Sequence, residues 1–484
     1  MDRGGSRLLG AGVMPEAPLL HHEPVPPSLM RRASEAQNAQ DFQTSIPLWG
    51  QVIAYAPGNA TGYYNRGRAL HKVGRNAEAA RDFERAIYLT SREPFEETQG
   101  PSAGATLWHN YAAALLLEHR DVAALAAIEK AIDLHPTNAE AHHCYAGILT
   151  TMNRDEQALK EFNTAHQLDP DRAETVIGIA MTLLRRSAGR DPEGWRLFET
   201  RRAKGITDLY PDMPLWRGQA AFPIAGRTIF VRSEQGYGDT LQFVRYIAPL
   251  LYAGAKVTLE VPRGLMRLFR RCLWPHEDLA LYESKPGLPP MHDYQTALMT
   301  LPVAFPDFHE RRALPYLDAA HDSLLETPED NRFLPGFKVG LVWHGGARPN
   351  DPDADSIDKR RSLPQPDAMQ LESELRLRCP VYSLQQEDLP PGSDFLDTAR
   401  LVAQLDVVIT VDSAVAHLAA AMGKPVWLLD RYSPCWRWGL GSATTHWYST
   451  MTIYRQPVPG DWGPVIARVL ADLDVLLDAP KDAA

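Results

Sequence analysis

The amino-acid sequence predicts a multidomain protein in which an all-α array of helical repeats precedes two α/β lobes. Three observations support this fold class. A period of 34 residues runs through residues 28–204, short β-branched segments alternate with helical segments after residue 225, and a chain of 484 residues is too long for one ordinary core. We therefore expect about three folded domains.

Composition and charge are those of a globular protein. Hydrophobic residues make up 44% and charged residues 23% of the chain, and 60 acidic against 50 basic residues give a net charge of −10. This acidic balance argues against broad electrostatic binding to nucleic acid. Because no apolar run reaches the length of a signal peptide or a membrane span, we expect residues 1–27 to form a disordered leader on a cytoplasmic protein.

Cysteine and acid spacing indicate no metal site. Cys144, Cys272, Cys379 and Cys435 lie far apart, with neither CxxC nor zinc-ligand spacing, which suits a reducing cytoplasm. The acidic segment "DPDAD" at residues 351–355 consists of turn-forming residues, so we expect a solvated loop there. The sequence thus predicts no metal and no bound cofactor.

Small residues and prolines define the repeat. Pro136 and Pro170 lie 34 residues apart, and Ala124 recurs as Ala158 at the same spacing. An earlier copy is offset by 11 extra residues, which fall in the polar segment "REPFEETQGPS". The pattern resembles the tetratricopeptide repeat, a pair of antiparallel helices with small residues at the crossing and a proline after the second helix.

On this resemblance, residues 28–204 form four to five stacked helix pairs. The small and aromatic residues of the period are core positions, and we assign them no function. Proteins of this repeat family bind peptides or protein segments on the concave face, so a protein or peptide partner is implied there. A linker is expected at residues 205–225.

After the linker, predicted strands alternate with predicted helices. "RTIFVRS" and "KVTLEV" flank a helical segment, and a second series of the same kind follows. We expect two lobes, residues 226–325 and 326–478, each with a parallel sheet flanked by helices, and a tail at 479–484. Ligands of such sheets bind beyond the carboxyl ends of the strands.

The loop after the first predicted strand contains a candidate site. Gly236 and Gly238 lie between this strand and a helix, as in a dinucleotide-binding loop, but Leu241 occupies the third glycine position. Asp239 stands where a pyrophosphate would approach the helix start, and its carboxylate would repel phosphate. Asp239 is then either a helix cap or a general base directed into a cleft, and position alone favours the cap.

The second lobe offers a better phosphate site. In "DVVITVDSAVAHLAAAMGKPVWLL" a buried strand is followed by a sharp turn at Asp412 and Ser413 and then by a helix. The free amide groups of Ser413 and Ala414 at the helix start would face an anion. For His417 on the same helix, a structural role and a binding role remain equal alternatives.

Nearby loops are expected to contribute to the same site. Gly345 and Gly346 follow one predicted strand, and Gln385 follows another. A basic cluster contains Lys359 and Arg361, and isolated charges of this kind usually lie solvated on the surface. The position of the cluster after a strand and a glycine pair favours a functional role.

Together these segments resemble one enzyme family. Residues 224–261, with "VDSAVAHLAAAMGKPVWLL", "CWRWGL" and "GDWGPVIARV", are similar to bacterial proteins that carry tetratricopeptide repeats ahead of a glycosyltransferase domain. That domain resembles the heptosyltransferases of glycosyltransferase family 9, which have the two-lobed GT-B fold. The resemblance covers about the last 270 residues. Cys435 departs from it, because the family carries an acid there.

The resemblance implies separate roles for the two lobes. In the heptosyltransferases an aspartate after the first strand faces the acceptor and acts as the base, and Asp239 matches it. The loop residues that the resemblance places on the acceptor side are Gln235, Gly236, Gly238 and Thr240.

On the donor side, the family binds the diphosphate of the sugar donor at a helix start, and a basic residue of a preceding loop neutralises the leaving group. Lys359 or Arg361 matches that basic residue. The other donor-side residues implied are Gly345, Gly346, Gln385, Asp412, Ser413, Ala414 and His417.

The mechanism we expect is a direct, inverting displacement on a nucleotide sugar, which serves as co-substrate without a metal. Asp239 would accept the proton of the acceptor hydroxyl while the nucleotide diphosphate leaves. Two alternatives stay open, a repeat scaffold with a degenerate sugar-nucleotide-binding domain and, further away, a dehydrogenase. The repeats would recruit a protein acceptor, so removal of residues 28–204 would abolish protein modification and spare donor hydrolysis.

Overall fold

The structure is a computed structural model, and it describes residues 24–91, 102–204, 210, 212–218, 222–273, 276–285, 289–308, 315–317, 334–346, 348 and 352–478. The chain divides into two compact units, Met1–Ala103 and Gly104–Ala484. Outside the described residues lie the predicted leader up to residue 23, the insertion at 92–101, the expected lobe boundary at 325 and 326, and the tail at 479–484.

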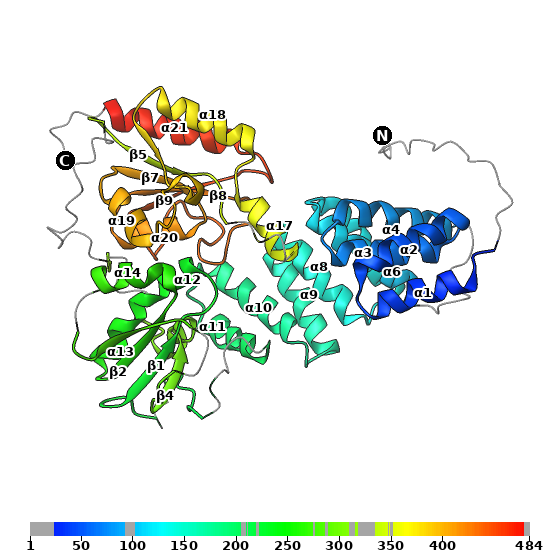
Figure 1. The fold of residues 1–484 in the computed structure, drawn as a ribbon, viewed down its shortest axis with the longest axis horizontal. Helices are drawn as coiled ribbons and strands as arrows, with labels where there is room; N and C mark the ends of the chain where they lie inside the picture. Colours follow the sequence, from blue (N-terminus) through cyan, green and yellow to red (C-terminus); the bar gives the residue numbers. More distant parts are fainter. Residues whose placement is uncertain are drawn as a thin grey trace, which may run out of the picture. The chain divides into compact units, whose positions relative to one another are not determined.

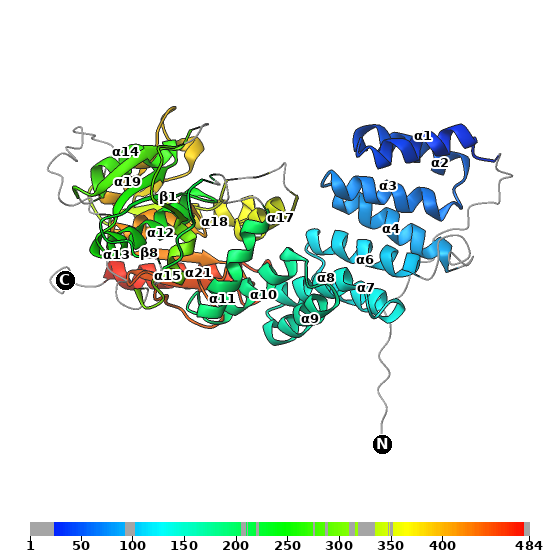
Figure 2. The ribbon, with the colours of Figure 1, turned by 90° about the horizontal axis from the view of Figure 1, so that it is seen from below.

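The first unit is built from antiparallel helices, and Figure 2 shows them as successive layers. Gly67 explains one close approach, because a Cβ there would lie 2.8 Å from the ring of Phe83 on the following helix. Asn59 caps the helix that carries Gly67 by accepting a hydrogen bond of 2.8 Å from the amide of Gly62. The helices are α1 (Pro27–Asn38), α2 (Phe42–Tyr55), α3 (Ala60–Lys72) and α4 (Asn76–Thr90).

The second unit begins with helices of the same kind. Gly178 repeats the role of Gly67, because a Cβ there would lie 2.5 Å from the ring of Phe162. Ala124 and Ala158 are fully buried, as the period predicts for core positions. The helices are α6 (Ser102–Leu117), α7 (Asp121–Leu134), α8 (Ala139–Thr151), α9 (Asp155–Leu168), α10 (Ala173–Arg186) and α11 (Pro192–Phe198), followed by a 3-10 helix (Glu199–Lys204).

The first α/β lobe has a four-stranded parallel sheet in the order β3-β2-β1-β4. Its strands are β1 (Thr228–Arg232), β2 (Lys256–Val261), β3 (Leu279–Glu283) and β4 (Tyr294–Ala297), and its helices are α12 (Tyr237–Phe243), α13 (Ile247–Tyr252), α14 (Arg263–Cys272) and α15 (Leu301–Ala304), with 3-10 turns at Val244–Tyr246 and Leu298–Thr300.

The second lobe has a five-stranded parallel sheet in the order β6-β5-β7-β8-β9. Its strands are β5 (Val339–Val342), β6 (Val381–Ser383), β7 (Val407–Val411), β8 (Val426–Asp430) and β9 (Met451–Arg455), and its helices are α17 (Pro352–Arg361), α18 (Gln365–Arg376), α19 (Phe395–Ala403), α20 (Ala414–Ala421) and α21 (Gly463–Asp478), with a 3-10 turn at Gln386–Asp388. The predicted fold class, an all-α repeat region followed by two parallel α/β lobes, is confirmed.

One expectation about the second lobe is wrong. The segment "DPDAD" was expected to be a solvated loop, whereas α17 begins at Pro352 within it, and Ala354 and Ser356 are buried. Proline is well suited to the first position of a helix. The tertiary contacts of this helix, described below, outweigh the turn propensity of its acidic residues.

The two lobes meet at a seam where α12 packs on α20 and α14 packs on α19 (Figure 1). One continuous apolar cluster extends through both lobes and includes Trp195 and Phe198 of α11. The ring of Trp195 contacts both lobes at once, with centroids 5.7 Å from Phe243 and 5.2 Å from Trp436. Helix α11 also packs on α15 of the first lobe. The last repeat helices therefore share the core of the α/β lobes.

Among the helices that the structure describes, none combines the length and the apolar character needed to cross a lipid bilayer.

Candidate functional site

The loop after β1 places Asp239 in the first turn of α12. Gly236 precedes this helix in an extended conformation, and Asp239 is the third helical residue. The Oδ2 atom of Asp239 accepts a hydrogen bond of 2.9 Å from the amide of Gly236, an arrangement that satisfies a free donor at the helix start. One carboxylate oxygen therefore has the helix-capping role that position favoured, and the second oxygen remains available for other contacts.

The remaining residues of this acceptor-side loop are held differently. Gln235 is exposed and has a φ of 62°, which turns the chain sharply between β1 and α12. Thr240 is buried and its hydroxyl donates to the carbonyl of Gly236 over 3.3 Å. Glu234 is buried and accepts two hydrogen bonds, of 2.7 and 3.0 Å, from Arg201 at the end of the repeat array. The buried ion pair between Arg201 and Glu234 thus fixes the loop that leads to Asp239.

The second oxygen of Asp239 faces the other lobe. Its Oδ1 atom forms an ion pair with Arg437, whose Nε donates to the side-chain oxygen of Gln242 over 2.5 Å. The guanidinium also lies 4.2 Å from the ring centroid of Trp436 and donates to the sulfur of Cys435 over 3.2 Å. Arg437 thus connects the second lobe with two residues of α12.

Arg437 is a permanent cation in this setting. Burial disfavours its charge most strongly, but Asp239, Cys435 and Asp412 together raise the pKa of the guanidinium above its ordinary value. Only 10% of the Arg437 side chain and 17% of the Asp239 side chain are exposed. A pair this shielded is little weakened by salt.

Gly238 allows the two helix starts to approach each other. A Cβ at this position would lie 3.0 Å from Cδ2 of His417 and 3.5 Å from Cα of Ala414. Both of these residues belong to α20, the helix whose start was predicted to bind phosphate. The structure therefore brings the predicted acceptor loop and the predicted donor helix together.

His417 has the environment of a neutral, structural histidine. It is buried, its Nδ1 lies 2.9 Å from the hydroxyl of Tyr448, and its ring stacks on Trp438 with centroids 5.5 Å apart. Burial, and then the charges of Arg437 and Arg245, lower its pKa well below the ordinary value. Of the two alternatives left by the sequence, the geometry favours the structural one, because a neutral ring offers no charge to a diphosphate.

The start of α20 lacks a side-chain cap in the part of the chain that is described. Ser413 precedes the helix, but its hydroxyl lies 3.0 Å from that of Thr410, and within the described residues no side chain caps α20. The first amide groups of a helix lack intrahelical acceptors and carry its positive partial charge. The role of Ser413 and Ala414 toward an anion stays a prediction, and the uncapped helix start is compatible with it.

Of the two basic residues proposed for the donor side, Arg361 lies at this turn and Lys359 does not. Arg361 donates to the carbonyl of Asp412 over 3.1 Å and forms an ion pair of 2.8 Å with Asp358. Its Nε is buried and has no hydrogen-bond partner among the described residues. Lys359 points to solvent instead, with 68% of its side chain exposed and an ion pair to Asp355 at 2.7 Å. Helix geometry explains the difference, because residues two positions apart face different directions.

The loops after β5 and β6 complete this side. A Cβ at Gly345 would lie 2.5 Å from the Arg361 guanidinium, whereas Gly346 is exposed and a Cβ there would meet no other side chain or backbone of the described residues within 4 Å. Gln385 is buried, and its Oε1 has no hydrogen-bond partner among the described residues. Its amide nitrogen donates to Glu387 over 3.4 Å, and Glu387 also accepts from His344. Gln385 and Arg361 thus each retain an unused polar atom at the carboxyl edge of the sheet.

Sequence reasoning assigned no role to Arg437. The segment "CWRWGL" contributed to the family resemblance, but nothing in its spacing showed that the arginine reaches Asp239, 198 residues earlier in the chain. An arginine between two tryptophans was the available signal, because such a cation is commonly buried against aromatic rings.

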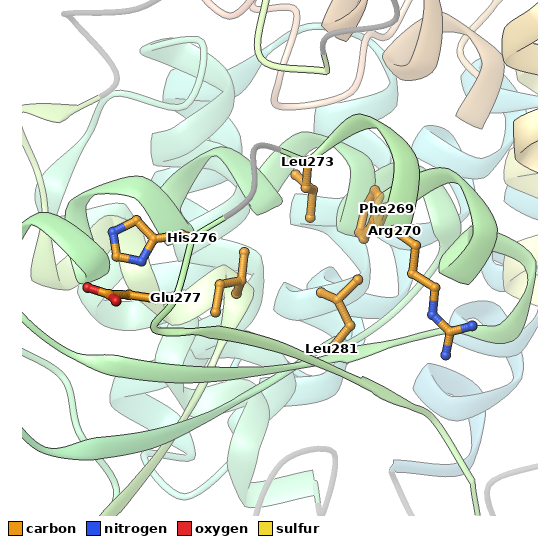
Figure 3. A pocket seen from close by; sticks show the side chains of 7 residues that line it. Phe269, Arg270, Leu273, His276, Glu277 and Leu281 are labelled. Carbon is orange, nitrogen blue, oxygen red and sulfur yellow. The ribbon is translucent and has the colours of Figure 1, made fainter. Parts of the chain in front are cut away.

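A surface pocket on the first lobe lies away from Asp239. It has a volume of about 630 Å³ and lies between the end of α14 and the start of β3 (Figure 3). In Figure 3, His276 and Glu277 lie at one end and Arg270 at the other, with Leu281 of the strand below Phe269 of the helix. Because α14 follows the carboxyl end of β2 and runs back, its last turn marks the opposite edge of the sheet from Asp239.

In the part of the chain that is described, no group of three or more His, Cys, Asp or Glu residues is arranged to hold a metal ion.

Comparison with known proteins gives matches in both regions of the chain. A family model described as glycosyltransferase family 9 (heptosyltransferase) matches residues 373–454, and a tetratricopeptide repeat model matches residues 60–92. Protein FlbA of Caulobacter vibrioides is 25% identical over 324 residues, which are 59% of this chain and 52% of FlbA. Tetratricopeptide repeat protein 36 of Mus musculus is 35% identical over 79 residues, 16% of this chain and 40% of that protein. The chain thus spans about half or less of the curated relatives it matches.

Solved structures also match part of the chain. MamA has a TM-score of 0.30 and 16% identity and covers 36% of this chain and 94% of its own. YrrB, described as a repeat protein with an unusual peptide-binding site, has a TM-score of 0.30 and 17% identity and covers 38% of this chain and 86% of its own.

Proposed function

We propose, from the tetratricopeptide repeat and the C-terminal glycosyltransferase family 9 domain that the chain carries, that it transfers a sugar from a nucleotide sugar to an acceptor hydroxyl at the seam between the lobes. One observation supports this proposal above all. The loop before Asp239 and the uncapped start of α20 lie in contact at Gly238, so the carboxylate lies near the helix-start amides that we propose to bind the diphosphate.

In the proposed reaction, the acceptor oxygen attacks the anomeric carbon as the bond from that carbon to the diphosphate oxygen breaks. The proton of the hydroxyl passes to Asp239, and attack opposite the leaving group inverts the anomeric centre. The contact with Gly236 holds one carboxylate oxygen of Asp239 in place. For the other oxygen to meet the hydroxyl, it must exchange its contact with Arg437 for the substrate.

Charge on the departing diphosphate would be stabilised by groups of the second lobe. The amides of Ser413 and Ala414 supply the partial positive charge of a helix start, and Arg361 supplies a full charge beside the same turn. Arg437, once released from Asp239, is a second cation at the seam. We propose that these groups allow transfer without a divalent metal, so activity should persist in excess EDTA.

The repeats are proposed to recruit a protein acceptor or partner. The test must keep the last helices, because Trp195 and Phe198 belong to the core of the lobes and removal of residues 28–204 would open it. Residues 104–484 form a compact unit of their own, so a chain cut at that boundary is the appropriate variant. We expect it to turn over the donor while losing transfer to protein, and equal protein transfer by both chains would refute recruitment by the first helices.

A panel of nucleotide sugars tests the transfer itself. A donor that binds the folded chain should raise its melting temperature, because a ligand that binds only the native state stabilises it. The stabilising donor is then assayed for hydrolysis and transfer with the unaltered protein and Asp239→Asn. Turnover that disappears in the variant supports the proposal, and equal turnover in both proteins removes Asp239 from the chemistry.

A non-catalytic scaffold is the second candidate, and one observation favours it. Both carboxylate oxygens of Asp239 have partners in this structure, Gly236 in the same loop and Arg437 in the other lobe. A degenerate domain that keeps this pair closed would bind a nucleotide sugar without turnover. Donor-induced stabilisation with no product from any donor would establish that reading.

A further inference from the structure

Helix α17 contacts the repeat array on one face. Arg360 donates two hydrogen bonds to Asp121 at the start of α7, of 2.7 and 3.0 Å, and a third of 2.8 Å to the carbonyl of Leu116 in α6. Only 15% of the Arg360 side chain and 9% of the Asp121 side chain are exposed. Two-point contact between a guanidinium and a carboxylate fixes orientation as well as distance.

A second contact supports the same face. Ser356 lies one helical turn before Arg360. Its hydroxyl oxygen lies 3.2 Å from Nε2 of His119, in the turn between α6 and α7. Burial, and then the charge of Arg360, lower the pKa of His119 to about 4. The ring is therefore neutral near pH 7 and can form its hydrogen bond with Ser356 beside the Arg360 cation without charge repulsion. Leu116 in the last turn of α6, His119 in the following turn and Asp121 at the start of α7 therefore hold α17.

Other residues of α17 make contacts on the proposed donor side. Asp358 forms an ion pair of 2.8 Å with Arg361 and accepts two hydrogen bonds, of 2.8 and 2.9 Å, from Arg348. Arg361 then reaches the carbonyl of Asp412 and covers Gly345. Consecutive helix residues differ in direction by about 100°, so fixing Arg360 on the repeats also fixes the direction of Arg361.

We infer that Asp121 is a positioning residue of the donor site: through Arg360 it orders α17 and thereby places Arg361 over the turn at Asp412. The role of Arg361 toward a diphosphate rests on the proposed function, whereas the ordering of α17 by the repeats does not. On this inference, the repeat array supports the proposed donor site in addition to its proposed role in recruiting a protein.

The acceptor side shows a parallel arrangement. Arg201, in the 3-10 helix that ends the repeat array, is paired with Glu234, and Glu234 also accepts from the amide of Met299 over 3.2 Å. Glu234 belongs to the loop that carries Asp239. Residues of the repeat array therefore hold the loop before α12 in the first lobe and helix α17 in the second lobe.

The experiment compares Asp121→Asn with Asp133→Asn in the full-length chain. Asp133 lies on the same helix, and its exposed side chain forms a surface ion pair of 3.5 Å with Lys130. The first readout is amide hydrogen exchange of residues 352–361, and the second is the affinity for inorganic pyrophosphate, a probe for the diphosphate of the donor. Asp121→Asn should speed exchange in α17 by about tenfold and weaken pyrophosphate binding by about tenfold, the loss expected when one charge-assisted contact is removed. Asp133→Asn should change neither.

A double-variant comparison separates positioning from general damage. In the background of Arg361→Gln, Asp121→Asn should weaken pyrophosphate binding no further, because it acts through the missing side chain. Arg360→Lys keeps the charge and loses the two-point contact, so an intermediate effect is expected. This milder variant also decides the matter if Asp121→Asn unfolds the chain.

The outcomes distinguish the inference from the proposed function. Unchanged exchange in α17 for both Asp121→Asn and Arg360→Lys overturns the inference, as does an undiminished effect of Asp121→Asn in the Arg361→Gln background. If the unaltered chain binds no pyrophosphate, the donor-site proposal fails, and the exchange measurement still decides whether the repeats order α17.

Discussion

Asp239 of the first lobe and Arg437 of the second lobe form an ion pair across the seam, and Arg437 bonds in the same place to Gln242 of α12. The arginine therefore inserts into the first lobe rather than meeting it at the surface. Because the partner of the proposed base comes from the lobe proposed to bind the donor, we expect binding of the two substrates to be coupled.

Replacing the proposed base should remove turnover. Asp239→Asn should lower kcat by at least about 100-fold, the usual contribution of a positioned general base, with little change in the affinity for the donor. Glu283→Gln is the matched control, since Glu283 is an exposed carboxylate at the same edge of the sheet. Initial rates of transfer measured for the three proteins decide the matter, and a similar loss in both variants would speak against a specific role for Asp239.

The interlobe pair should contribute measurably to stability. Arg437→Gln leaves Asp239 shielded from water without its cation, so we expect a loss of about 3 kcal/mol in the free energy of unfolding. Combined with Asp239→Asn in a double-mutant cycle, the coupling should be about 1–3 kcal/mol by urea unfolding. Arg376→Gln, which removes a surface pair with Glu372, should cost less than about 1 kcal/mol. Zero coupling would mean that the pair does not hold the lobes together.

Arg361 and Lys359 can be separated by one pair of variants. Arg361→Gln should raise KM for the donor by about 10-fold or more, because the lost cation lies beside the turn at Asp412. Lys359→Gln removes the same charge from a solvated position and should leave KM within about twofold. Steady-state kinetics at fixed acceptor concentration measure both. A larger effect from Lys359 would transfer the donor role to that residue.

The two neighbouring glycines after β5 offer a similar contrast. Gly345→Ala would place a methyl group 2.5 Å from the Arg361 guanidinium, which is the movable end of a long side chain. We therefore expect little loss of stability but about tenfold weaker donor binding as Arg361 is displaced. The added methyl group of Gly346→Ala meets nothing within 4 Å in the described part of the chain, so this variant should behave like the unaltered protein. Melting temperature and donor titration are the measurements, and equal donor affinity in both variants would contradict the placement of Arg361.

Asp430 should make stability depend on pH. Burial, more than the proximity of Asp412, raises its pKa from 3.8 to about 6, although Arg455 at 2.8 Å acts in the opposite direction. Between these two values the folded state keeps a proton that the unfolded state has released. The free energy of unfolding therefore falls as pH rises from about 4 to about 6 and stays lowered above it.

Asp430→Asn should abolish this fall. Relative to the unaltered protein, the variant should gain up to about 3 kcal/mol between pH 4 and pH 7, since one pKa unit corresponds to about 1.4 kcal/mol. Urea unfolding at several pH values measures the difference. Asp474→Asn, at an exposed ion pair with Arg378, is the control and should show no such trend. A constant difference across the range would mean that Asp430 is ionised throughout.

Periodic features of the fold were predictable because they are local. The 34-residue spacing of Pro136 and Pro170 and the burial of Ala158 follow from helix pairs that pack only on their neighbours. The alternation of β-branched and helical segments predicted two parallel α/β lobes in the same way. The turn residues Gly238 and Asp412 were identifiable because turns of this kind at the carboxyl ends of parallel strands meet at one edge.

What the sequence alone could establish about this protein was therefore the kind of each element and the side of each sheet where chemistry would occur. Which cation reaches the turn at Asp412, whether His417 carries charge, and that Arg437 pairs with Asp239 depended on the tertiary structure. These properties depend on burial and on contacts between residues far apart in the chain. Neither produces a periodic pattern in the sequence from which it could be predicted.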